Sequence, residues 1–90
     1  MLLYSENVVL GDGAALEVSL WARGAERPGY RLRYGREGTW LVQYDDESGR
    51  GDRRRVRARV ARYEFRSVEQ LRYDFERDVE GLGDGDEAGA

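Results

Sequence analysis

Apolar and polar residues alternate with a period of two in several successive segments of this chain, and this pattern restricts its fold more than any other feature. The alternation is clear at residues 16–22, 30–34 and 39–45. Because the side chains of a β-strand point to opposite faces in turn, these segments predict strands with one buried and one solvent-facing side. Turns such as Gly11-Asp12-Gly13 separate the segments and favour antiparallel hairpin connections.

Two further strands are expected at the ends of this series. Residues 2–10 form the first strand, and residues 53–66, in which arginines alternate with small or apolar residues, form the fifth. Within this last segment Tyr63 and Phe65 fall on the parity opposite to that of the earlier apolar residues. We therefore predict a bulge or bend around residues 61–62, which returns both apolar sets to the core side.

The pattern becomes helical at Ser67. Ser67 and Gln70 have the spacing of a capping box, in which the two side chains satisfy free backbone N–H groups at the start of a helix. Apolar residues then recur at steps of three and four, as on one face of an amphipathic helix. They are Val68, Leu71, Phe75, Val79 and Leu82. We expect Gly81 or Gly83 to end this helix.

These elements predict an α+β fold, namely an antiparallel β-meander of about five curled strands with one C-terminal helix packed on the sheet. A chain of 90 residues is long enough for one such domain, which we place at residues 1–82. Residues 83–90 contain little that could be buried, so we expect them to form a flexible acidic tail.

Cysteine, histidine and lysine do not occur in the chain, and every cationic side chain is an arginine. This composition excludes disulfides, thiolate nucleophiles, imidazole bases, zinc sites built on cysteine or histidine, and Schiff-base chemistry. We predict neither a metal nor a cofactor. The apolar stretches are shorter than the roughly 18 residues of a membrane span, and no basic segment precedes an apolar one at the N-terminus. We therefore expect a cytoplasmic protein without a membrane partner.

Positive charge is concentrated in one part of the sequence. Residues 50–66 contain eight arginines and two acidic residues, whereas residues 1–49 and 67–90 have net charges of −3 and −6. A row of guanidinium groups binds RNA phosphates whatever the base sequence, and nearby aromatic rings suit single-stranded RNA. The candidate residues for binding nucleic acid or another anion are Arg53, Arg54, Arg55, Arg57, Arg59, Tyr63 and Trp21.

Two other roles for the same arginines stay open. Acidic residues of the chain itself can neutralise them through cross-strand pairs, because the whole chain has a net charge of −3 and is not basic as nucleic-acid-binding domains usually are. Alternatively, they can contact an acidic protein or a second copy of the chain. The domain would then mediate protein interaction or self-association and have no nucleic-acid role.

An acidic cluster near the basic segment is a second candidate site. It consists of Asp45, Asp46, Glu47 and Asp52. Its spacing does not match that of a calcium-binding loop, and acidic residues are common in turns for conformational reasons alone. A catalytic interpretation takes a carboxylate as base, arginines to neutralise phosphate charge and Tyr63 as an accessory proton donor, which gives a histidine-free ribonuclease-like activity. We favour binding over catalysis.

The order of segments also resembles a known group of proteins. Residues 40–50, with the pair Tyr44-Asp45, are followed by an Arg-rich strand and a closing helix that starts at Ser67. Over residues 30–82 this order resembles that of small prokaryotic domains of unknown function, and it is similar to the TumE-type toxin components of toxin–antitoxin pairs. Tyr44 and Asp45 match the motif of these proteins residue by residue.

The chain departs from this motif in one respect. The histidines of the family's loop have no counterpart, and Ser48, Arg50 and Asp52 stand in that region instead. If those histidines are catalytic, the resemblance implies that this chain is inactive or has another role. We therefore predict a small binding module, toxin-like or in contact with nucleic acid, that uses its Arg-rich strand.

Overall fold

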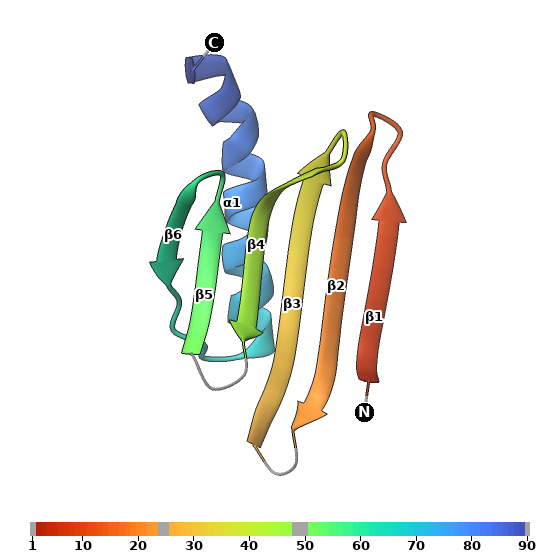
Figure 1. Cartoon of the computed structure of the whole chain (residues 1–90), viewed down its shortest axis with the longest axis vertical. Helices are drawn as coiled ribbons and strands as arrows, with labels where there is room; N and C mark the ends of the chain where they lie inside the picture. The colour runs from red at the N-terminus through yellow and green to blue at the C-terminus, as the bar shows by residue number, and fades with distance from the viewer. Residues whose placement is uncertain (1, 24–25, 48–50, 90) are drawn as a thin grey trace.

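The computed structural model describes residues 2–23, 26–47 and 51–89, with side chains for 2–23, 27–46 and 51–82. Six antiparallel strands follow one another in a sheet of order β1-β2-β3-β4-β5-β6, and a helix follows them (Figure 1). The elements are β1 (Leu2–Val9), β2 (Ala14–Arg23), β3 (Glu26–Arg36), β4 (Thr39–Glu47), β5 (Gly51–Val56), β6 (Arg59–Arg62) and α1 (Val68–Gly89). The predicted α+β meander is confirmed.

The turn residues explain why consecutive strands pair as hairpins. Glu37 and Gly38 connect β3 to β4, and both have a positive φ, of 51° and 80°. Two such residues form the tight turn whose twist matches that of the flanking strands. Asp12 accepts a hydrogen bond at 3.1 Å from the backbone N–H of Ala14, which stabilises the turn between β1 and β2.

The Arg-rich segment is not one strand, and this part of the prediction is wrong. The chain reverses at Arg57 and Ala58, where Arg57 has a φ of 54°, and β6 pairs back onto β5 with Val56 opposite Arg59. The reversal comes four residues before the bend that we expected at residues 61–62. Residues on the two sides of a two-residue turn pair although their positions in the sequence have opposite parity. The predicted change of parity therefore occurs, but it occurs in a turn at residues 57–58 and not in a bulge at residues 61–62.

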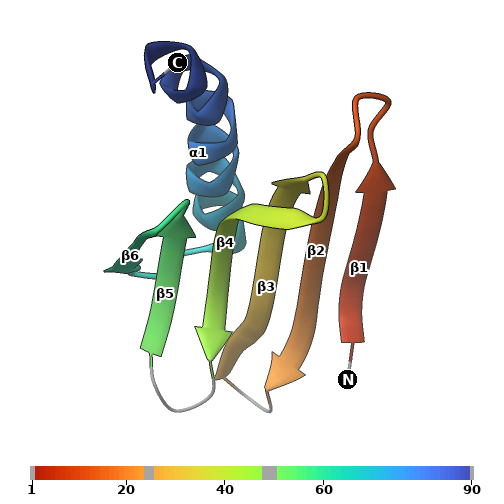
Figure 2. The same ribbon diagram turned by 45° about the horizontal axis from the view of Figure 1, so that its top comes forward.

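One face of the sheet carries α1 and the other is open. The helix lies along the side of the sheet formed by β4 and β5, and β1 lies at the edge away from it (Figures 1 and 2). The core lies between the helix and the middle of the sheet, where aromatic and branched side chains are buried. Its members are Tyr30, Leu32, Tyr34, Val42, Tyr44, Leu71, Phe75 and Leu82, with Ala14 and Val18 from β2.

The start of α1 agrees in part with the predicted capping box. The Ser67 Oγ accepts a hydrogen bond at 3.0 Å from the backbone N–H of Gln70, as expected for an N-cap. The Gln70 side chain does not complete the box, because its Nε2 donates at 2.8 Å to Asp74. The helix continues to Gly89, past the two glycines at which we expected it to end.

The division into a domain at residues 1–82 and a flexible tail at 83–90 stays a prediction. In the part of the chain that the structure describes, no helix has both the length and the apolar character needed to cross a membrane.

Candidate functional site

The face of the sheet that does not carry α1 is here called the open face. Several of the arginines and carboxylates considered below lie on it in two rows. Leu32, Tyr44 and Arg54 point toward the helix, so their neighbours along each strand point to the open face. These neighbours line up in two rows across β2 to β6. One row contains Ser19, Arg31, Asp45, Arg53 and Arg62, and the other contains Glu17, Arg33, Gln43, Arg55 and Val60.

Cations outnumber carboxylates in these two rows. Glu17 pairs with Arg33 at 2.6 Å and with Arg31 at 3.4 Å. Asp45 lies 3.9 Å from Arg53 and accepts a hydrogen bond at 2.7 Å from the Gln43 amide. Five arginines therefore share two carboxylates among the described side chains of the rows, which leaves three positive charges in excess.

Backbone oxygens hold another of these arginines in place. Arg55 donates to the carbonyl oxygen of Trp40 at 3.1 Å and to that of Arg57 at 2.8 Å. These contacts orient the guanidinium without neutralising its charge. Because a guanidinium has five N–H donors, it keeps hydrogen-bonding capacity for a ligand.

Two tryptophans lie on the open face, and one of them contacts an arginine. The Arg33 guanidinium lies 4.3 Å from the ring centre of Trp40, a cation–π contact. Trp21 covers Gly29 of β3 so closely that a Cβ at this glycine would come within 2.2 Å of the indole nitrogen. Only glycine at position 29 allows this packing, which fixes the indole against the sheet.

The structure separates the residues that we grouped from the sequence. Arg53 and Arg55 lie on the open face, but Arg54 points to the helix side, where its Nε lies 3.2 Å from Asp78. Arg57 lies in the β5–β6 turn and Arg59 begins β6. Trp21 is on the open face, but on β2, three strands from β5.

Tyr63 also lies apart from the open face. Its hydroxyl donates to Asp74 of α1 at 2.6 Å, and burial, followed by this hydrogen bond, raises the pKa of Tyr63 above its usual value. A phenol held in this way is a weaker proton donor, which argues against the accessory acid role that we considered. That these residues bind nucleic acid stays a prediction.

Arg31 and Arg33 were missed as site residues. The sequence did predict that they face away from Tyr30, Leu32 and Tyr34. The predicted meander also places β3 two strands from β5, but we did not combine the arginines of both strands into one surface. The strand order of the meander was the signal that could have found them.

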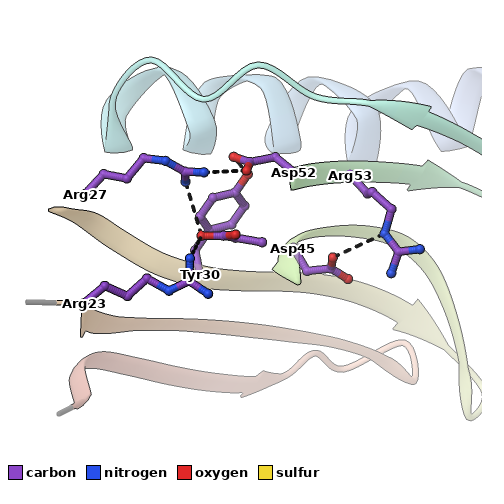
Figure 3. A network of polar contacts seen from close by, with 7 residues as sticks. Arg23, Arg27, Tyr30, Asp45, Asp52 and Arg53 are labelled. Atoms are coloured by element: carbon purple, nitrogen blue, oxygen red, sulfur yellow. Dashed lines mark hydrogen bonds and ion pairs between the residues drawn. The ribbon is translucent and has the colours of Figure 1, made fainter. Parts of the chain in front are cut away.

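The acidic cluster is divided between the two faces. Asp46 and Asp52 are buried on the helix side and stand directly opposite each other in β4 and β5. Arg27 bridges them, at 2.5 Å from Asp52 and 3.3 Å from Asp46, and Arg23 lies 2.8 Å from Asp46. Figure 3 shows Arg27 converging on Asp52, whereas Asp45 turns toward Arg53.

These acids are therefore already paired with arginines. Within the described residues there is no group of three or more acidic side chains that could hold a metal ion. Burial opposes the charge on Arg27, but the hydrogen bond to Asp52 and the charges of Asp52 and Asp46 raise the pKa of Arg27 above its usual value. The network connects the ends of β2 and β3 to β4 and β5.

The motif tyrosine, Tyr44, is buried on the helix side. Its hydroxyl donates to Asp78 of α1 at 2.5 Å, and burial, followed by this hydrogen bond, raises the pKa of Tyr44. A polar pocket of about 280 Å³ lies beside it, lined by Tyr44, Arg54, Asp74, Arg77 and Asp78. Two arginines and two aspartates share this pocket, so their formal charges balance. Tyr44 connects the sheet to the helix, while its neighbour Asp45 belongs to the open face.

Comparison with known proteins agrees with the segment order noted in the sequence. A family model described as Toxin TumE matches residues 4–82. The chain belongs to the TumE toxin family. The match begins in β1, so it includes two strands that our resemblance, limited to residues 30–82, had left out. No curated protein and no solved structure matches the chain.

Proposed function

We propose that this chain acts as the toxin-like member of a toxin–antitoxin pair and that it binds RNA through the open face of its sheet. The observation that carries the proposal is the excess of arginines over carboxylates in the two rows of that face. The TumE toxin family supplies the context, because its model matches residues 4–82 of the chain.

The geometry of the open face suits a polyanionic strand. Arg31 and Arg33 on β3 lie across β4 from Arg53 and Arg55 on β5, so the two pairs are about 10 Å apart, twice the usual strand spacing. Guanidinium groups at this separation can contact different phosphates of one strand, and they stay charged at any working pH. The Trp40 ring next to Arg33 adds an aromatic surface of the kind on which unpaired bases stack.

A single-stranded ligand fits this surface better than a duplex. The rows run across a sheet, which offers no helix or loop to enter a groove, and single-stranded RNA exposes its bases to flat aromatic surfaces. An acidic antitoxin segment would compete for the same arginines and would inhibit RNA binding by covering this face.

Salt-dependent binding tests the proposal. Binding of a short single-stranded RNA is followed by fluorescence anisotropy over a range of salt concentrations, for the wild type, R53Q/R55Q and the matched control R54Q. We expect the double variant to bind about tenfold or more weakly, with a slope of log affinity against log salt reduced by about 1.4. Because Arg54 faces the helix, R54Q should bind as the wild type does.

Two results would contradict RNA binding by this face. One is the absence of binding by the wild type at low ionic strength. The other is an equal loss in R54Q and R53Q/R55Q, which would place the contact elsewhere or attribute it to charge in general. Far-UV circular dichroism of each variant checks that the fold is retained.

A further inference from the structure

The outer edge of β1 is only weakly protected against pairing with another strand, because its one charged residue is Glu6 and its one irregularity lies between Leu2 and Tyr4. Within the part of the chain that the structure describes, β1 pairs with β2 on one side only. Its eight residues contain one charged residue, Glu6, and no proline. Leu2, Leu3 and Val9 are exposed. Long apolar edges of this kind pair readily with another strand unless charges, proline or bulges prevent it.

The opposite edge of the sheet is different. Strand β6 has four residues, two of which are Arg59 and Arg62, and its burial pattern is exposed throughout. A short edge with two cations opposes the addition of another strand. Copies of this chain joined from β1 to β6 would form an open filament, and the arginines of β6 disfavour it. The alternative is pairing of β1 with the β1 of a second copy, and this symmetric contact gives a closed dimer.

An apolar pocket lies beside β1 on the helix side of the sheet. It has a volume of about 250 Å³ and one cationic side chain at its border. The residues that line it are Tyr4, Val18, Leu20, Leu32, Val68, Leu71 and Arg72. Arg72 forms an ion pair with exposed Glu76 at 3.8 Å, which is a weak contact within one helix.

We propose that a second copy of this chain pairs with β1, strand to antiparallel strand, around a two-fold axis perpendicular to the sheet. A register centred on Glu6 would place this carboxylate opposite its own copy, which is unfavourable. A register centred on Ser5 avoids this contact and places the partner's Glu6 opposite Tyr4.

Charge complementarity supports the register centred on Ser5. Tyr4 and Arg72 line the same pocket, so the partner's Glu6 reaches the region of Arg72 and offers it a better-placed carboxylate than Glu76 does. By symmetry this ion pair forms twice. The irregularity in the pairing of β1 with β2 lies between Leu2 and Tyr4, outside the central pairs of the dimer.

The absence of cysteine from the chain allows a direct test of the register. In this dimer Ser5 faces the partner's Ser5, so oxidised S5C should form a covalent dimer in high yield, since facing residues of adjacent strands lie within disulfide reach. The matched variant N7C should not, because Asn7 and the partner's Asn7 would be about 13 Å apart along the strands. Non-reducing gels measure both.

Light scattering on variants in which the charges of Glu6 and Arg72 are reversed or exchanged completes the test. We expect a dimer for the wild type at high concentration, weaker dimers for E6R and R72E, and recovery in E6R/R72E. A wild type that is monomeric at every concentration overturns the proposal and leaves this edge to a different protein. Cross-linking of N7C in place of S5C, or no recovery in the double variant, overturns the register. None of these results depends on RNA binding.

Discussion

The two faces of one sheet use the same residue type in different ways. Arg53 and Arg54 are adjacent in β5, yet Arg54 pairs with Asp78 of the helix, whereas Arg53 belongs to the open face, where cations are in excess. Period-two alternation sends neighbouring arginines to opposite faces. The difference shows that an Arg-rich segment supplies both internal pairing and a charged surface.

Polar groups on the helix side are satisfied within the fold. The hydroxyls of Tyr30, Tyr44 and Tyr63 each donate to a carboxylate, at 2.6, 2.5 and 2.6 Å. Buried polar groups are stable only with such partners. Substitutions on this side should therefore change stability, and substitutions on the open face should change binding.

Truncation of the core should have the largest effect on stability. Leu71 of α1 is fully buried, so L71A should lower the free energy of unfolding by about 3 kcal/mol, through lost burial and the cavity left behind. Val60 on the open face is exposed, and V60A should change stability by less than about 0.5 kcal/mol. Urea denaturation measures both, and similar losses would contradict the assignment of the core to the helix side.

Disruption of the buried carboxylate network should have the second-largest effect on stability. D52A removes the acceptor of both Tyr30 and Arg27 and should cost about 2 kcal/mol, because it leaves a buried hydroxyl without a partner. On the open face, D45A should cost less than about 0.5 kcal/mol and should strengthen RNA binding by removing a negative charge from the arginine rows. Denaturation and anisotropy measure the two effects, and weaker RNA binding by D45A would contradict the proposed interface.

Much of this fold could be predicted because its signals are local. Alternation gave the strands, and the stripe that includes Leu71 and Phe75 gave the helix and its buried side. The β5–β6 hairpin could not be predicted, because its turn has neither glycine nor asparagine, and Arg57 adopts a positive φ that the sequence does not indicate. The segment therefore resembled one long strand.

The candidate site was predicted less completely because it depends on long-range order. Arg53 and Arg55 were found from local charge, but Arg31 and Arg33 become part of the same surface only when β3, β4 and β5 are placed side by side. Likewise, nothing local indicates that Arg27 bridges Asp46 and Asp52 across two loops. Such pairs join residues that are distant in the sequence, and local patterns do not show which of these residues meet in the fold.

High pH should weaken the helix side selectively. Burial and hydrogen bonds to carboxylates raise the pKa of Tyr30 and Tyr44 above the ordinary value of about 10, and the same causes act on Tyr63. The folded state thus keeps these protons after the unfolded chain has begun to lose them. The contribution of these hydroxyls to the free energy of unfolding is complete below about pH 10. It falls as the pH rises further, by up to about 1.4 kcal/mol per pH unit for each tyrosine.

Urea denaturation at increasing alkaline pH tests this dependence, with Y63F as the comparison. The variant lacks one of the three hydroxyls, so its stability should fall less steeply with pH than that of the wild type. Arginines of the open face stay charged in this range and should keep their affinity for RNA while the fold persists. Equal slopes for the two proteins would show that Tyr63 does not contribute to the effect.

The smallest effects on stability are expected for substitutions of the neighbouring residues Arg53 and Arg54. R54Q removes a guanidinium that contacts Asp78 at 3.2 and 3.3 Å and lies 5.9 Å from the centre of the Tyr44 ring. Because the Arg54 side chain is 43% exposed and partly screened by solvent, R54Q should lower the free energy of unfolding by about 1 kcal/mol. R53Q, 47% exposed and 3.9 Å from Asp45, should cost less than about 0.5 kcal/mol. RNA affinity should show the reverse order, because only Arg53 belongs to the open face. Equal effects of the two variants in both assays would mean that the faces do not differ in function.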